Sequence, residues 1–334
     1  MVVALFVRNN ILIMITKTFL AIFAVSLIQL NAADYKVVPD WVKLPEAREK
    51  IGNMHGDVAV SSKGEVYVSV MDAKAGLQVF SDAGKFLRNV TNAPSDFHGF
   101  VIKKEAGGEF IYGPRLGSGN ILKLTLDGKE VLNIPSSSIP DEFKSKNKEG
   151  ATRVAMTGMD VAPNGDLFVT DGYSSSFIHH FDKSGKYIKS FGGKKPPYNF
   201  TTLHKIAVDT RFTPVRIIAC DREALRVVHV SIDGEFIGVV AKDLLAPAAI
   251  AVQGDYALVG EIKGNVSVID KEGRIVTKLG LNMEKTEVGT NATPPTKWRP
   301  GIVTAPHGVA FNSKGDIFVA EYSVFGRVHR FNRQ

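Results

Sequence analysis

The sequence predicts an all-β protein, a single six-bladed β-propeller that spans residues 34–334. Three observations lead to this fold class. First, a unit of two short strands joined by a Gly- or Asn-bearing turn occurs six times. Second, a third strand follows each copy and usually leads into a tight Asp-Gly or Ser-Gly turn. Third, the last copy stops one strand short. Repeated units of about 40–60 residues with three or four strands are the signature of a β-propeller.

The repeated unit can be followed in order along the chain. Clear copies are "GMDVAPNGDLFVTDG" and "PHGVAFNSKGDIFVAE", in which short apolar strands flank a turn. The six copies lie at residues 56–70, 98–113, 158–172, 203–221, 247–261 and 306–321. Two longer stretches, 135–154 and 282–301, are predicted to be polar connections between blades 2 and 3 and between blades 5 and 6. A closed ring explains the repetition, because each blade covers the edge of its neighbour.

The last copy lacks its fourth strand. It ends at Gln334, just after its third strand, "RVHRFNRQ". The extended segment "DYKVVPDWVKLP" (34–45) belongs to no other copy. We therefore predict that this N-terminal segment closes the ring as the outermost strand of the last blade, since an unpaired edge would invite aggregation.

Residues 1–33 have the order of a secretory signal: a lysine, an apolar run and then small residues. Cleavage is expected near Ala32 or Ala33, and Met14 is an alternative start to Met1. The sequence thus predicts a secreted or periplasmic protein. The alternative is an uncleaved N-terminal anchor, which would hold the protein at a membrane. Cys220 is the only cysteine, so an internal disulfide is excluded.

The balance of charge argues against nucleic acid as a partner. The net charge is +7 at pH 7, but the basic residues are scattered and are not interleaved with aromatic ones. This distribution is typical of a solvated surface. We expect a monomer whose partner is a small anionic or peptide substrate in the central channel.

Histidine recurs at one register of the repeat. When the copies are aligned on the small residue of their first strand, the equivalent positions are Gly56, His98, Met159, His204, Ala248 and His307. The histidines fall on blades 2, 4 and 6, about a third of a turn apart, and the first strands line the channel, so the three imidazoles should converge on the axis. Three neutral imidazoles with an open position are a zinc arrangement. The alternative is that they are polar residues lining a wet channel.

The remaining histidines are expected to lie outside this set. His55 is one residue out of register and is not counted among the ligands. Four others lie on third strands and are expected to be structural or exposed: His179, His180, His229 and His329.

The repeat also resembles a known family. Its pattern P-x-G-V-A-V-D-x-x-G-x-I-Y-V resembles the NHL repeat, and "VTDGYSSSFIHHFDKSGKYIKSFGG" followed by "LHKIAVD" and "ACDREALRVVHV" is similar to the propeller of peptidyl-α-hydroxyglycine α-amidating lyase. The resemblance implies zinc on His98, His204 and His307, a catalytic Tyr173, and Arg222 near the substrate. It implies cleavage of a carbinolamide N–C bond to an amide and an aldehyde acid.

The chain departs from that family at two sites. Met71 stands where the family has an arginine in blade 1, and Arg115 of "YGPRLGSG" either replaces that charge as a catalytic residue or is a surface arginine. Gly308 stands where the family has an acidic residue that helps to hold calcium, so the implied calcium site is only partly kept.

Two functions therefore compete. The histidines and Tyr173 favour a zinc-dependent carbon–nitrogen lyase, whereas the missing arginine favours a non-catalytic NHL propeller that binds a peptide, a glycan or a protein partner. A lactonase is a weaker third, because that chemistry usually needs a carboxylate and amide metal site. The acidic residues that follow the second strands, Asp171, Asp221 and Glu321, are expected to cap turns through backbone N–H groups.

Overall fold

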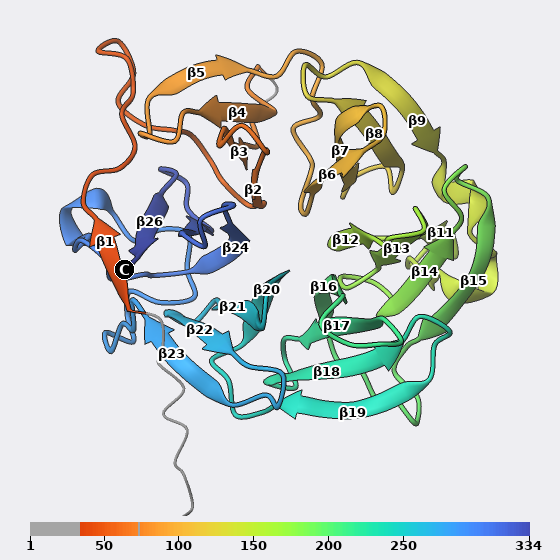
Figure 1. Cartoon of the computed structure of the whole chain (residues 1–334). Coiled ribbons are helices and arrows are strands. Elements are labelled where there is room, and N and C mark those ends of the chain that lie inside the picture. The colour runs from red at the N-terminus through yellow and green to blue at the C-terminus, as the bar shows by residue number, and fades with distance from the viewer. Residues whose placement is uncertain (1–33, 73) are drawn as a thin grey trace, which may run out of the picture. The chain divides into compact units, whose positions relative to one another are not determined.

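The computed structural model describes residues 34–72 and 74–334, and it confirms the predicted fold class. Six antiparallel sheets of four strands each are arranged in a ring around a central axis (Figure 1). The expected signal segment, residues 1–33, lies outside the described residues. Within the ranges described, no helix has the length and apolar character needed to cross a membrane.

Each blade is a meander whose first strand lies innermost (Figure 1). Blades 1 to 3 are β2 (Val58–Val60), β3 (Val66–Ser69), β4 (Leu77–Phe80) and β5 (Phe86–Asn89); β6 (Val101–Glu105), β7 (Gly108–Pro114), β8 (Ile121–Thr125) and β9 (Glu130–Ile134); and β12 (Gly158–Val161), β13 (Leu167–Thr170), β14 (Phe177–Phe181) and β15 (Tyr187–Gly192). Blades 4 to 6 are β16 (Leu203–Asp209), β17 (Arg216–Asp221), β18 (Arg226–Ser231) and β19 (Phe236–Ala241); β20 (Pro247–Gln253), β21 (Tyr256–Glu261), β22 (Asn265–Ile269) and β23 (Ile275–Leu279); and β24 (Pro306–Phe311), β25 (Ile317–Glu321), β26 (Val328–Arg333) and β1 (Tyr35–Val38).

The ring is closed by the N-terminal strand, as predicted. β1 pairs antiparallel with β26, with Tyr35 opposite Arg333 and Val38 opposite Arg330. Only Tyr35–Val38 of the predicted segment forms this strand. The rest continues to blade 1, where Trp41 is buried between Phe80 and Phe318 at ring-centroid distances of 6.0 and 5.2 Å. The segment therefore joins the last blade to the first.

The hydrophobic core is divided among the six interfaces between neighbouring blades. Each apolar cluster draws its side chains from two adjacent blades, as in the cluster that combines Tyr67 of blade 1 with Phe100 and Ile111 of blade 2. The same holds around the ring. This arrangement follows from sequence, because second strands such as LFVT of β13 and IFVAE of β25 are apolar at most positions and can be buried on both faces only between two other sheets.

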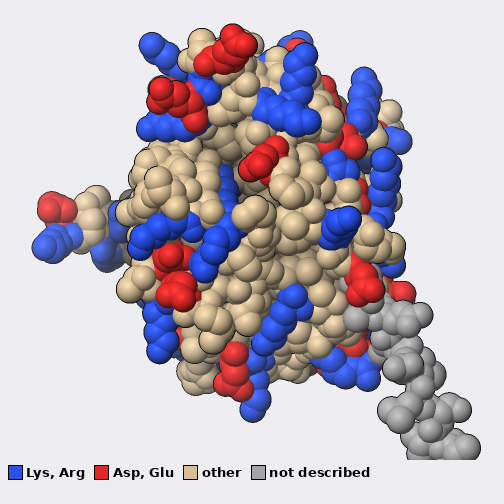
Figure 2. All heavy atoms as spheres, turned by 90° about the vertical axis from the view of Figure 1, so that its left-hand side faces the viewer, with Lys and Arg blue, Asp and Glu red and all other residues tan. Residues whose placement is uncertain are grey.

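The two long connections carry little regular structure. Residues 135–154 contain two short 3₁₀ turns, η1 (Ser136–Ser138) and η2 (Asp141–Phe143), and a hairpin of β10 (Ser145–Lys146) and β11 (Thr152–Arg153). The second connection contains η3 (Pro295–Lys297). Figure 2 views the side of the ring near β1, where basic and acidic side chains are interspersed. That face has no continuous basic stripe.

The third-strand histidines are structural, as expected. His180 contacts Asp166, His229 contacts Asp209 and His329 contacts Glu321, each within 2.9 Å. His179 is bonded to Ser190. All four are buried and form these bonds within their own blades.

Candidate metal centre

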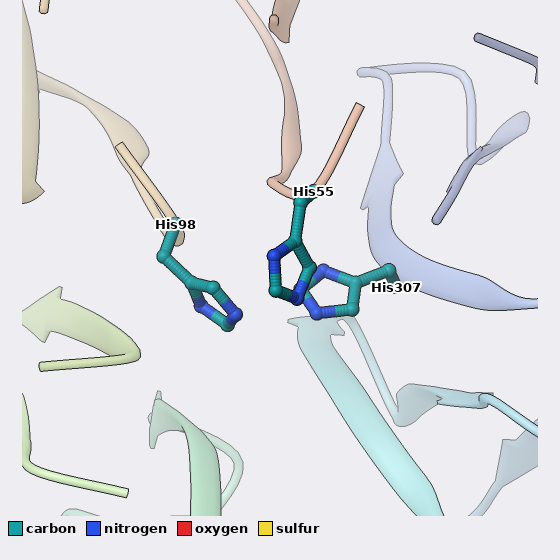
Figure 3. Close-up of side chains that lie close together, drawn as sticks. All are labelled: His55, His98 and His307. Atoms are coloured by element: carbon teal, nitrogen blue, oxygen red, sulfur yellow. The ribbon is translucent and has the colours of Figure 1, made fainter. Parts of the chain in front are cut away.

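Four imidazoles, not three, meet at one mouth of the channel. We call His55, His98, His204 and His307 the histidine cluster. The rings of the three predicted ligands are mutually close, with centroid distances of 4.6 to 5.0 Å. His55 lies 4.8 Å from His98 and 4.9 Å from His307. The ligand atoms of His55, His98 and His307 lie within 4.8 Å of one another, and their rings point toward a common region (Figure 3).

Local irregularities in the inner strands aim these side chains at the axis. The pairing of β16 shifts register between Leu203 and Lys205, so that His204 is the extra residue. β24 shifts in the same way around His307. A bulge of this kind re-aims a side chain that regular alternation would direct elsewhere. His98 lies in the turn that precedes β6.

Each of the three predicted ligands is held by a backbone carbonyl of the next blade. Nδ1 of His98 lies 2.8 Å from Thr157 O, that of His204 lies 2.6 Å from Ala248 O, and that of His307 lies 2.9 Å from Gly56 O. A carbonyl only accepts hydrogen bonds, so each Nδ1 must carry the proton and each Nε2 keeps a free lone pair. This orientation is typical of metal-binding histidines.

The same bonds correct the predicted register in blade 3. Thr157, and not Met159, occupies the position equivalent to Ala248 and Gly56, since its carbonyl receives the neighbouring imidazole. Met159 belongs to the apolar core between blades 2 and 3. The predicted alignment of blade 3 was therefore wrong by two residues. It was based on the apolar residues of the first strand, whereas the equivalent position, Thr157, lies just before them.

Burial keeps the histidine cluster uncharged. Loss of solvent lowers the pKa of His98 to about 3 and that of His55 to about 4. It lowers the pKa of His204 and His307 well below the usual 6.5, and the other imidazoles and Arg222 add to the effect on His204. Neutral imidazole is the form that binds a metal ion, so the cluster needs no deprotonation near pH 7.

Tyr173 lies over the cluster with Arg222 beside it. Its hydroxyl is 2.9 Å from His204 Nε2 and 3.1 Å from His98 Nε2, and Arg222 Nη1 donates to it at 3.2 Å. The two residues come from blades 3 and 4, as predicted. Burial raises the pKa of Tyr173, while Arg222 acts in the opposite direction. From the sequence, a lowered pKa was predicted for Tyr173 only beside a bound zinc ion. Without the metal, its raised pKa keeps the phenol protonated near pH 7.

His55 is the member that the sequence interpretation missed. It lies in the segment before β2, where its Nε2 is 3.4 Å from the Tyr173 hydroxyl and its ring is 4.4 Å from that of Tyr322. A signal was present in the sequence. His55, His98 and His307 are each followed by glycine, whereas alignment on the strand placed His55 one residue out of register.

Arg115 lies in another environment. Its guanidinium pairs with Asp96 at 2.8 Å, and the Asp96 carboxylate also accepts from Gly117 N. Among the described residues, no hydrogen bond or ion pair joins Arg115 to the histidine cluster or to Tyr173. Met71, at the position of the family's blade-1 arginine, is 45% exposed.

The donor set fits a zinc-class ion. His307 Nε2 is buried and has no hydrogen-bond partner within the described part of the chain. One ligand nitrogen from each of His55, His98 and His307 lies within 4.8 Å of the others, and nitrogen ligands of this kind suit zinc. Calcium prefers oxygen ligands. A side chain at Gly308 would place its Cβ 2.6 Å from Asp57 Oδ1, so this position has no room for the family's carboxylate.

Comparison with known proteins supports the fold alone. No protein-family model matches the chain. Virginiamycin B lyase from Staphylococcus aureus superposes with a TM-score of 0.58 at 13% identity, over 90% of this chain and 100% of that one. A gluconolactonase from Xanthomonas campestris superposes with a TM-score of 0.63 at 10% identity, over 91% and 92%. A protein of unknown function from Bacteroides thetaiotaomicron has a TM-score of 0.63 at 13% identity, over 90% and 76%. The chain is thus similar to propellers that include lyases and lactonases.

Proposed function

We propose that the protein is a metal-dependent carbon–nitrogen lyase that acts at the histidine cluster. The observation that carries the proposal is the assembly of Tyr173 and Arg222 directly over neutral imidazoles, with the Tyr173 hydroxyl within 3.1 Å of the Nε2 atoms of His98 and His204. His98, His204 and His307 would hold a zinc-class ion, with His55 at its side. The N-terminal pattern supports placing this activity in the secreted or periplasmic compartment.

The protein groups have separate roles in this proposal. A bound zinc ion would act as a Lewis acid toward the hydroxyl or carboxylate of a substrate. The Arg222 guanidinium is positioned to hold a carboxylate, because its planar donors can form two hydrogen bonds to one. The Tyr173 hydroxyl accepts from Arg222 and faces two imidazole nitrogens, so it can relay a proton at the Oη atom.

The reaction is the cleavage of an α-hydroxyglycine amide. The substrate hydroxyl loses its proton, its oxygen forms the carbonyl of glyoxylate, and the C–N bond breaks. The proton reaches the leaving nitrogen, which departs as a primary amide. No oxidant or water is consumed. The resemblance of blades 3 and 4 to the amidating lyase supports this substrate class, and the lyases among the structural neighbours are compatible with it.

The test is a direct assay on protein loaded with zinc. We expect release of glyoxylate from α-hydroxyhippurate, loss of that activity on treatment with a chelator, and its recovery with zinc. Tyr173→Phe should retain the metal and lose turnover by about 100-fold or more, as expected for a general acid–base group. Arg115→Gln is the matched control and should retain activity. Metal binding without glyoxylate release would overturn the proposal in favour of a propeller that binds a peptide, a glycan or a protein.

A further inference from the structure

A buried ion pair crosses the channel next to the histidine cluster. Asp57 belongs to blade 1 and Lys205 to blade 4, which are opposite each other in a ring of six, and their charged groups are in contact. The two residues are 3% and 4% exposed. A contact between opposite blades must pass through the axis, so this pair ties together the starts of two inner strands that belong to different sheets.

Both members of the pair adjoin parts of the histidine cluster. Lys205 directly follows His204 in the chain. Asp57 directly follows Gly56, whose carbonyl accepts from His307 Nδ1. A shift of either residue would therefore move an imidazole or the carbonyl that holds one.

The Lys205 side chain also packs on the backbone that holds His98. Gly99 follows His98, and a Cβ on it would lie 3.0 Å from Lys205 Nζ. The carbonyl of Thr157 accepts from His98 Nδ1, and Gly158 comes next in the chain. A Cβ on Gly158 would lie 2.7 Å from Lys205 Cδ. The lysine therefore lies directly against the backbone on both sides of this hydrogen bond.

Asp57 contacts the backbone of two further blades. Its carboxylate accepts from Val58 N at 2.9 Å and from Phe100 N of blade 2 at 3.4 Å. Gly308, which follows His307, leaves room for it, because a Cβ there would lie 2.6 Å from Asp57 Oδ1. Through these contacts the pair fixes the backbone of blades 1, 2, 3, 4 and 6 relative to one another around the axis.

Stability alone does not explain an ion pair at this depth. Desolvation of two buried charges offsets much of their attraction, so apolar residues of similar volume often stabilise a fold as well or better. Such a pair does fix one arrangement, because either charge loses its partner when it moves. We propose that Asp57 and Lys205 are positioning residues that hold the three carbonyl-bonded imidazoles in place for a metal ion. The inference rests on the metal-binding role proposed above for the cluster.

Two measurements on the purified protein test this role. Heteronuclear NMR of metal-free protein follows the Nδ1–H protons of the three imidazoles, and competition with a chromogenic chelator gives the zinc affinity. Because Lys205→Met alone leaves the Asp57 charge unpaired, the variant used is Asp57→Asn/Lys205→Met. We expect exchange of those protons with water to become about tenfold faster or more as their hydrogen bonds loosen. Zinc binding should weaken by about 10–100-fold, the usual cost of losing a group that orients a ligand.

Lys103→Met is the matched control. Lys103 pairs with Asp160 at 2.6 Å between the inner strands of blades 2 and 3. Neither residue lies next in the chain to a histidine of the cluster or to a carbonyl that holds one. Loss of this second channel ion pair should leave both proton exchange and zinc affinity as in the wild type.

A second, milder variant keeps the test decisive. Gly158→Ala retains both charges but crowds Lys205 Cδ, so it should change proton exchange and zinc affinity in the same direction by a smaller amount. If both variants lower the stability but leave proton exchange and zinc affinity at wild-type values, the pair has only a structural role and the proposal is wrong. An equal effect of Lys103→Met would also overturn it.

Failure of the proposed lyase would be seen separately. Zinc binding without glyoxylate release would end the lyase proposal, while the two variants would still support or overturn the positioning role. If the wild type binds no zinc, the metal-binding role on which the inference rests is wrong, and the inference is overturned with it.

Discussion

At the scale of single residues, hydrogen bonds to backbone carbonyls distinguish the imidazoles of the cluster. His98, His204 and His307 each have Nδ1 held by the neighbouring blade, so their Nε2 atoms are fixed in direction. Within residues 34–72 and 74–334, His55 has no such bond, and its Nε2 makes a long contact of 3.4 Å with Tyr173. An imidazole that is already fixed loses little conformational entropy when it binds a metal ion. The ligand atoms of His55, His98 and His307 lie within 4.8 Å of one another, so proximity favours His55 as the third ligand, whereas the fixed ring favours His204.

The loss of zinc affinity on substitution should show which of these histidines bind the metal ion. His204→Ala should weaken zinc binding by more than about 100-fold, since loss of a group that merely orients a ligand already costs 10–100-fold. His55→Ala should weaken it by less. Competition with a chromogenic chelator measures both. The reverse order would assign the third ligand to His55.

The uncharged imidazoles predict a loss of stability in acid. Burial lowers the pKa of His98 from 6.5 to about 3, so below pH 6.5 the unfolded chain takes up a proton that the folded chain does not. The free energy of unfolding of metal-free protein should then fall by about 2 kcal/mol per such histidine between pH 7 and pH 5. Urea titrations at both pH values measure it. His98→Gln should show a smaller fall, and an unchanged pH dependence would contradict this account.

At the scale of elements, buried acidic residues fix the loops that carry the site. Asp171 accepts from Ala155 N at 2.6 Å and Ser175 N at 3.2 Å, and Glu321 accepts from Thr304 N at 2.8 Å. Asp221 accepts from the backbone of Thr201 and Thr202. The expectation that these acidic residues cap turns is confirmed. Their place directly before Gly172, Arg222 and Tyr322 explains how rigid strands hold the rim residues.

Removal of one cap should destabilise its blade. Asp221 is fully buried and also pairs with Arg226 at 2.9 Å. Asp221→Ala should lower the free energy of unfolding by about 3 kcal/mol, because the partly buried Arg226 guanidinium and two backbone donors lose their partner. Asp233→Ala, at an exposed turn, is the control and should change little. Denaturation in urea compares the two, and equal stabilities would refute the capping role.

At the scale of the whole molecule, one short segment holds the ring closed. β1 completes the last sheet, and Trp41 packs between blades 1 and 6. Every other blade is a continuous stretch of chain, whereas this one joins the two ends of the described chain. The stability of the ring therefore depends on contacts at this closure.

Loss of that closure should be measurable. Trp41→Ala should lower the free energy of unfolding by about 3–5 kcal/mol, as large aromatic truncations in a core do. Deletion of residues 34–45 should lower the melting temperature further and promote association through the exposed edge of β26. Differential scanning calorimetry and light scattering report these effects. A monomeric deletion variant with an unchanged melting temperature would show that the closure is dispensable.

The sequence by itself determined the architecture and part of the site. The repeat period, the missing last strand and the shared register of His98, His204 and His307 can each be recognised by comparing short copies of one repeated unit, without knowledge of any contact between them. The tertiary structure decided the rest. His55 joins the cluster, and Thr157 takes the aligned position predicted for Met159, only because blades far apart in sequence share one axis. The bond from His307 to Gly56 spans 251 residues, and the contact of Asp57 with Lys205 joins blades 1 and 4. The burial that raises the pKa of Tyr173 also depends on other blades, since its ring lies beside those of His55, His98 and His204. Local spacing carries no information about such contacts, because the ring alone brings their partners together.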